Sequence, residues 1–173
     1  TPHDKERLQS FRGEERPVPD CLIQSFFESR AVKHPDKAAV VFGEKTLTYR
    51  ELEEKANQTA NYLISLGVKG GEVVGVCLER SEEMIVSVLG ILKAGCCYLP
   101  MDPSFPDDRI QYMFEDSGAG ILISQSSLKS KFHHFSNAHL VLTDTNSADI
   151  SGSGITKPAL KTDNSSPAYI IYT

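Results

Sequence analysis

The sequence predicts an α/β protein with a largely parallel sheet flanked by helices. Segments of strand length alternate with segments of helix length over residues 48–143, the order typical of a parallel sheet with crossover helices. The segment 72–78, "EVVGVCL", is almost wholly apolar, as in strands that are covered on both faces. Three helix-length segments end at a glycine, Gly67, Gly95 or Gly118, and glycine is the common stop residue of a helix.

The first elements are a helix and a hairpin. Asp20 is expected to cap a helix over residues 21–34. We expect its apolar side to contain Leu22, Phe26, Phe27 and Val32. Strands over residues 37–42 and 45–49 follow, joined by a two-residue turn at Gly43–Glu44.

The next helix has the clearest local signal in the chain. Thr48 lies three residues before Glu51, the spacing of a capping box, in which side chain and backbone satisfy each other at the helix start. One side of the helix carries the apolar residues Leu52, Ala56, Ala60 and Leu63. Gly67 is expected to end the helix in a left-handed conformation.

The remaining elements alternate as an α/β sheet requires. We expect a helix from Ser81 to Gly95, a strand over 96–101, a helix over 107–118 with Pro106 at its first position, a strand over 120–124, a short helix over 126–132 and a strand over 139–143. The segment 144–166 shows no such pattern and is too long for an ordinary connection between two elements, so it is predicted to form a mobile surface loop. The segment 168–173, "AYIIYT", is predicted to return to the sheet as a strand.

Composition excludes several classes of function. A net charge of -5 argues against a nucleic-acid surface, which needs a basic patch. The longest apolar stretch, residues 84–92, is too short to span a membrane. The charged residues at the start of the sequence lack the apolar core of a signal peptide. These observations predict a cytoplasmic protein with neither a nucleic-acid nor a membrane partner.

The residues themselves predict no metal site. The histidines His133, His134 and His139 lack helical ligand spacing and a completing acidic or thiol cluster. The cysteines Cys21, Cys77, Cys96 and Cys97 form no Cys-x-x-Cys pair and are expected to be buried, reduced thiols.

Two further segments are candidates for ligand sites. Residues 151–154, "SGSG", lack both a preceding strand and the lysine of a phosphate-binding loop, which favours a flexible loop. Asp144 follows a predicted strand, where open α/β sheets bind ligands, but a supporting acidic pair is not evident. No nucleophile has an identifiable base, so we expect no catalytic residue in this chain.

Two segments carry a resemblance to a known family. "LTYRELEEKAN" and "LKAGCCYLPMDPSFPDDRI" resemble the first two core motifs of adenylation domains in nonribosomal peptide synthetases. These domains belong to the adenylate-forming superfamily, with acyl-CoA synthetases and luciferases. The matched positions are Leu47, Thr48, Tyr49, Glu51 and Leu52, then Leu92 to Gly95, Tyr98, Pro100, Asp102 and Pro103. Cys97 replaces the usual alanine, and Met101 stands where isoleucine or leucine is more common.

The resemblance implies a domain organisation. Residues 1–20 would be a linker, and residues 21–173 the N-terminal part of the large subdomain of an adenylate-forming enzyme. In that family the segment like 168–173 runs into a glycine- and hydroxyl-rich loop that wraps the phosphates of ATP. Thr173 matches the first residue of that loop and is the one expected cofactor-binding residue. The chain is therefore expected to be truncated before this loop and inactive by itself.

The resemblance also implies an activity. The parent enzyme would use ATP and Mg²⁺ to convert an amino acid or other carboxylate into an acyl-adenylate, with release of pyrophosphate. It would then pass the acyl group to the phosphopantetheine thiol of a carrier protein. Neighbouring synthetase domains would be its other partners. Helix capping and turn formation already explain the residue types of both motifs, which favours a structural role for them. Lys93 and Asp102 are the only polar motif residues that could have a role beyond structure. Two alternatives remain open: an acyl- or aryl-CoA ligase of the same superfamily, and a noncatalytic α/β scaffold or docking module.

Overall fold

The computed structural model describes residues 11, 19, 21–135, 138–159, 162 and 164–173. Its elements are α2 (Ile23–Lys33), β1 (Ala38–Phe42), β2 (Lys45–Thr48), α3 (Tyr49–Ser65), β3 (Val73–Val76), α4 (Glu82–Lys93), β4 (Cys97–Pro100), α5 (Asp107–Asp116), β5 (Ile121–Ser124), the 3₁₀ helix η1 (Ser126–Phe132), β6 (His139–Leu142) and α6 (Ser147–Ser151). Within this part of the chain, no helix is both long and apolar enough to cross a membrane.

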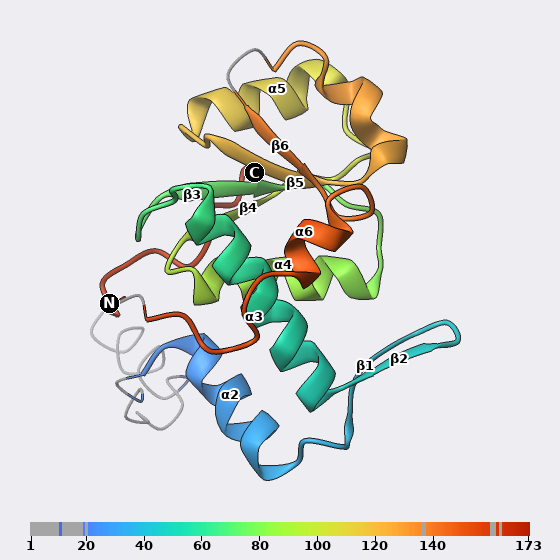
Figure 1. The fold of residues 1–173 in the computed structure, drawn as a ribbon. Helices are drawn as coiled ribbons and strands as arrows, with labels where there is room; N and C mark the ends of the chain where they lie inside the picture. Colours follow the sequence, from blue (N-terminus) through green and yellow to red (C-terminus); the bar gives the residue numbers. More distant parts are fainter. Residues whose placement is uncertain (1–10, 12–18, 20, 136–137, 160–161, 163) are drawn as a thin grey trace, which may run out of the picture.

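A four-stranded parallel sheet organises the molecule, in the order β4-β3-β5-β6, and confirms the predicted fold class. Helices α3 and α4 lie on one face of the sheet and α5 on the other (Figure 1). The alternation of side chains along the strands explains the two cores. Val74 of β3 and Ile123 of β5 belong to the core beneath α3 and α4, whereas Leu122 belongs to the core beneath α5 and η1. Both faces of the central strands are therefore covered, as the apolar run predicts.

The first hairpin forms as predicted and projects from the body of the domain (Figure 1). Gly43 in its turn has a φ of 59°, which glycine adopts without steric cost. Helix α5 begins at Asp107, the start of the predicted range, but Pro106 is its N-cap residue and not its first helical residue.

The capping box at the start of α3 is confirmed. The Oγ1 of Thr48 accepts a hydrogen bond from the backbone N–H of Glu51 at 3.2 Å, and Oε2 of Glu51 accepts one from the backbone N–H of Thr48 at 2.8 Å. The four predicted apolar residues, Leu52, Ala56, Ala60 and Leu63, are all buried. Beyond the helix, Gly67 has a φ of 91°, the predicted left-handed stop.

Replacing Thr48 by alanine is expected to lower the free energy of unfolding by about 0.5–2 kcal/mol, the usual cost of losing an N-cap side chain. Urea denaturation measures this change. Thr48→Ser is the matched control, because serine keeps the capping hydroxyl and is expected to preserve most of the stability. Equal losses in the two variants would show that the hydroxyl is not what stabilises α3.

The predicted apolar stripe of the first helix is wrong. Of the predicted residues, Phe26 and Val32 are 52% and 82% exposed, whereas Leu22 and Phe27 are half-buried and the ring of Phe27 stacks on that of Tyr49. The buried residues of α2 are instead Gln24 and Ala31, and Leu22 is its N-cap residue. The predicted cap, Asp20, lies outside the described residues. The apolar spacing failed because α2 meets α4 through Gln24 and Glu28, and Phe27 is the predicted residue that contacts α3.

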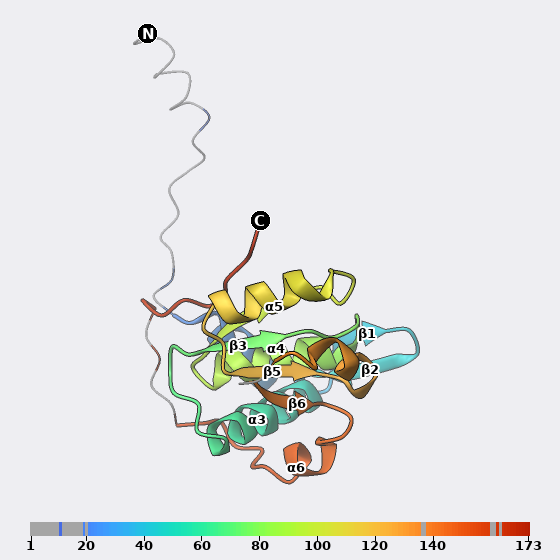
Figure 2. The same ribbon diagram turned by 90° about the horizontal axis from the view of Figure 1, so that it is seen from above.

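The prediction of a mobile loop over 144–166 is also wrong for most of its length. Residues 147–151 form α6, and the segment after α6 follows α3, as both views show (Figures 1 and 2). Side-chain amides of α3 donate hydrogen bonds to backbone carbonyls of this segment: Gln58 to Ser151 at 2.7 Å, Asn57 to Ile155 at 2.8 Å and Asn61 to Thr156 at 2.9 Å. The segment is therefore anchored without having a strand or a long helix of its own.

The segment 168–173 does not form the predicted strand. A single parallel bridge links Tyr169 to Tyr98 at the edge of β4. The N–H of Tyr98 donates to the carbonyl of Ala168 at 3.0 Å, and the N–H of Ile170 donates to the carbonyl of Tyr98 at 3.1 Å. Beyond the bridge, the hydroxyl of Tyr172 donates to the carboxylate of Asp116 on α5 at 2.7 Å. The residue of β4 that would donate the next ladder hydrogen bond is Pro100, which has no N–H, so the regular pairing stops after the bridge.

Candidate functional site

The two polar motif residues that remained open, Asp102 and Lys93, both make internal contacts. The carboxylate of Asp102 accepts a hydrogen bond from the N–H of Ser104 at 2.8 Å, in the turn between β4 and α5. Hydrogen bonds from Ser104 lower the pKa of Asp102 below its ordinary value. Asp102 is thereby part of a turn, as the scaffold interpretation of the second motif predicts.

Lys93 lies at the end of α4 and is the centre of a buried ion cluster. Its side chain is only 1% exposed. The ammonium group lies 2.6 Å from the carboxylate of Glu28 on α2 and 3.0 Å from that of Glu53 on α3. The other oxygen of Glu28 binds Lys157, in the segment after α6, at 2.6 Å. Four elements that are distant in the sequence thus meet at this cluster, and two carboxylates are balanced by two ammonium groups.

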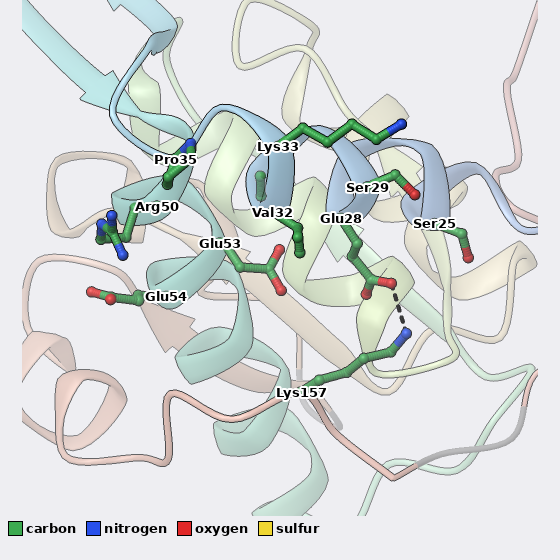
Figure 3. Close-up of a pocket in the computed structure, with 11 residues that line it drawn as sticks. Ser25, Glu28, Ser29, Val32, Lys33, Pro35, Arg50, Glu53, Glu54 and Lys157 are labelled. Atoms are coloured by element: carbon green, nitrogen blue, oxygen red, sulfur yellow. Dashed lines mark hydrogen bonds and ion pairs between the residues drawn. The ribbon is translucent and has the colours of Figure 1, made fainter.

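The ion cluster borders a groove of about 840 Å³ between α2 and α3 (Figure 3). Glu28 and Glu53 point into it from the two helices, and Lys157 reaches Glu28 from below. Burial alone would raise the pKa of Glu28, but the hydrogen bonds from Lys157 and Lys93 outweigh it, and the pKa lies below the ordinary value. Glu28 is therefore an anion at neutral pH. The groove brings together paired charges but no nucleophile with a base, so its chemistry is that of a structural junction.

The carboxyl end of the sheet, where open α/β sheets bind ligands, is occupied by turn contacts. Asp144 follows β6, and its carboxylate accepts hydrogen bonds from the N–H groups of Ser126 at 3.1 Å and Thr145 at 2.9 Å. The hydroxyl of Ser126 also donates to it, and these bonds lower the pKa of Asp144. Asp144 therefore caps the start of η1 and is not arranged as a phosphoacceptor.

The histidines are not assembled into a metal site. The rings of His133 and His134 lie against each other at a tilt of 46° with their centroids 3.6 Å apart, and Nδ1 of His133 lies 2.6 Å from the carbonyl oxygen of Ser130. Among the residues that the structure describes, no group of three His, Cys, Asp or Glu side chains could hold a metal ion.

Three of the four cysteines are buried as predicted, namely Cys77, Cys96 and Cys97, and all four are free thiols. Burial raises the pKa of Cys77 to about 12 and that of Cys96 to about 11, so these thiols stay protonated and unreactive at neutral pH. The prediction is wrong for Cys21, which is exposed, just before α2 begins.

Thr173, the predicted cofactor-binding residue, is exposed. It follows directly on Tyr172, whose hydroxyl is bound to α5, while Ile170 and Tyr172 pack against the core beneath that helix. The segment before Thr173 is thus held at one edge of the sheet, and Thr173 itself faces solvent. Sequence reasoning missed the acidic partners of Lys93, and only the charged residues of the predicted helices could have hinted at them.

The fold and the two motif segments define an α/β domain of the adenylate-forming class. The sequence model of the family "AMP-binding enzyme" matches residues 27–173, and the chain belongs to this family.

Peptide synthetases are prominent among the similar proteins. The chain is 42% identical over 154 residues to bacitracin synthase 3 of Bacillus licheniformis, covering 89% of this chain and 2% of that protein. It is 49% identical over 125 residues to bacitracin synthase 2 of the same organism, covering 72% of this chain and 5% of that protein. The chain therefore spans only a small share of the relatives that it matches.

Among solved structures, the nonribosomal peptide synthetase FmoA3 in its form bound to α-methyl-L-serine-AMP has 34% sequence identity and a TM-score of 0.89, covering 98% of this chain and 19% of that chain. A form of the same protein bound to AMPPNP matches with a TM-score of 0.89. These similarities agree with the fold class and with the family that the motifs predict.

Proposed function

We propose that residues 21–173 are the N-terminal part of an amino-acid-activating adenylation domain of a nonribosomal peptide synthetase, and that residues 1–20 are the linker before it. The single observation that carries this proposal is the identity of 42% over 154 residues to a bacitracin synthase. The position of the motifs supports it, since one motif caps α3 and the other forms the end of α4, all of β4 and the following turn. We propose a cytoplasmic location for the parent enzyme.

The proposed reaction joins the carboxylate of an amino acid to the α-phosphate of ATP and releases pyrophosphate. The acyl group then passes from the adenylate to the phosphopantetheine thiol of a carrier protein, next to the other synthetase domains. Cationic groups must neutralise the phosphoryl oxygens in such a reaction. The resemblance to the family places the groups that bind Mg²⁺ outside residues 21–173, and we propose the same arrangement for the parent enzyme.

Thr173 is proposed to contact ATP at the start of the phosphate-binding loop. Its side chain is exposed, and a hydroxyl in that position can donate a hydrogen bond to a phosphate oxygen. The segment before it is fixed to β4 by the Tyr98–Tyr169 bridge. This anchoring would limit the movement of the loop relative to the sheet.

A chimera tests the proposal. Residues 21–173 replace the matching segment of the adenylation domain of bacitracin synthase 2, and amino-acid-dependent exchange of pyrophosphate into ATP is measured. The chimera is expected to catalyse exchange, whereas the 173-residue chain alone is expected to be inactive. Thr173→Ala in the chimera is expected to lower the exchange rate about 10- to 100-fold, since a hydrogen bond to a charged group contributes about 1.5–3 kcal/mol.

Thr173→Ser is the control in the same chimera and should retain most of the activity, because the hydroxyl is kept. A folded chimera without exchange would contradict the proposal and favour a noncatalytic scaffold. Exchange by the isolated chain would contradict the assignment of the catalytic groups to other parts of the enzyme.

A further inference from the structure

Helix α2 is attached to the body of the domain through a few contacts: two polar ones to α4 and the stacking of Phe27 on Tyr49 of α3. Within α2, only Gln24 and Ala31 are buried. Gln24 donates a side-chain hydrogen bond to the carbonyl of Leu92 on α4 at 3.1 Å. Four residues later along the helix, Glu28 binds Lys93 at 2.6 Å. An element with little buried apolar surface and a few specific polar contacts belongs to the low-stability part of a structure.

The ion cluster is arranged so that α2 can separate from α3 and α4 without leaving a buried charge unpaired. Lys93, whose side chain is 1% exposed, keeps a second carboxylate 3.0 Å away, that of Glu53 on α3. The other partner of Glu28, Lys157, is 64% exposed and needs no replacement. If α2 moves away, Glu28 becomes hydrated while the Lys93–Glu53 pair stays intact. An unpaired buried charge, the largest electrostatic cost of opening, is thereby avoided.

We propose that the ion pair between Glu28 and Lys93 is an ionic latch. When this pair breaks, α2 separates as a unit from α3 and α4, which stay folded together with the sheet. The opening has a consequence for a second cavity. Ile23, Gln24 and Phe27 of α2 line a mostly apolar groove of about 380 Å³ together with Leu92 and Tyr98. Opening of the latch removes the part of the lining that α2 contributes and uncovers the rest. This inference is independent of the proposed enzyme activity.

Hydrogen–deuterium exchange of the full chain tests the latch. In Glu28→Gln the amides of α2 are expected to exchange about tenfold or more faster, because the charged hydrogen bonds of Glu28 to Lys93 and Lys157 are weakened or lost. The amides of β3 and β5 are expected to keep their exchange rates. Glu54→Gln is the matched control, because Glu54 lines the same groove between α2 and α3 and has no ion pair with the described residues. This control is expected to leave α2 unchanged.

The wild-type chain provides a second measurement that does not depend on the variant's folding. At low urea concentrations, exchange in α2 should depend less on urea than exchange in β5, because local opening exposes less surface than global unfolding. Equal urea dependence in α2 and β5 would overturn the latch. So would a Glu28→Gln variant that exchanges no faster in α2, or that speeds exchange in α2 and β5 equally.

Discussion

Replacing Lys93 by methionine is expected to lower the free energy of unfolding by about 3–5 kcal/mol, the range for removing one partner of a buried ion pair. Methionine has a similar length and fills most of the same space. The ammonium group, however, is the shared partner of Glu28 and Glu53, whose side chains are only 14% and 23% exposed. Without it, two carboxylates face each other in a poorly hydrated place.

Urea denaturation of the wild-type chain and the Lys93→Met variant measures this effect. Lys131→Met is the control, because Lys131 pairs with Asp107 at the surface, where both side chains remain partly exposed, and surface pairs contribute little. The combined variant with Glu28→Gln and Glu53→Gln should recover part of the loss, since a buried cluster can be replaced as a whole at small cost. Equal effects of Lys93→Met and Lys131→Met would contradict the buried role of Lys93.

The same cluster predicts the direction of acid sensitivity. The pKa of Glu28 lies below its ordinary value of 4.5 in the folded chain. Its contribution to stability is therefore complete above that ordinary value and is lost as the pH falls through the folded-state pKa. In Lys93→Met, part of this loss between neutral and acid pH should disappear, which urea denaturation at several pH values detects.

Replacing Gly90 by alanine is expected to lower the free energy of unfolding by about 1–3 kcal/mol, the usual cost of overpacking. At an ordinary helix position the same change would stabilise by about 1 kcal/mol. In α4, however, a Cβ at residue 90 would lie 2.6 Å from Cβ of Thr59 and 3.3 Å from the carbonyl oxygen of Ala56. The oxygen of Ala56 is a backbone atom and Cβ of Thr59 is bonded directly to the backbone, so neither can rotate away and the two helices would have to separate.

Gly120→Ala is the control for this experiment, since a Cβ at residue 120 would have no atom within 4 Å and the residue has no positive φ. It is expected to leave stability nearly unchanged. Thermal or urea denaturation of both variants gives the comparison. A Gly90→Ala variant as stable as wild type would show that α3 and α4 are not held at the distance that the structure gives.

The candidate site could be predicted only in part. Reasoning from the motifs singled out Lys93 and Asp102 and favoured a scaffold role for both, which their contacts support. The partners of Lys93 were missed, because Glu28 and Glu53 lie 65 and 40 residues away in the sequence. Thr173 stays a prediction, since its assignment depends on the motif alone.

What the sequence by itself determined was local. The hydroxyl of Thr48 and the carboxylate of Glu51 are three residues apart, so backbone geometry brings them together wherever the helix lies. The apolar run of β3 likewise requires cover on both faces, whichever helices provide it. Fold class and family follow from such signals.

Only the tertiary structure decided the contacts between distant elements. Asn61 anchors a segment 95 residues further along the chain, and the bond of Tyr172 to Asp116, 56 residues away, accompanies the end of pairing with β4. Ile23, Phe26 and Val32 of α2 remain exposed because the side of the helix that meets α4 is set by Gln24 and Glu28. Each of these contacts depends on the relative positions of packed helices and strands, and the periodicity of a single segment carries no information about those positions.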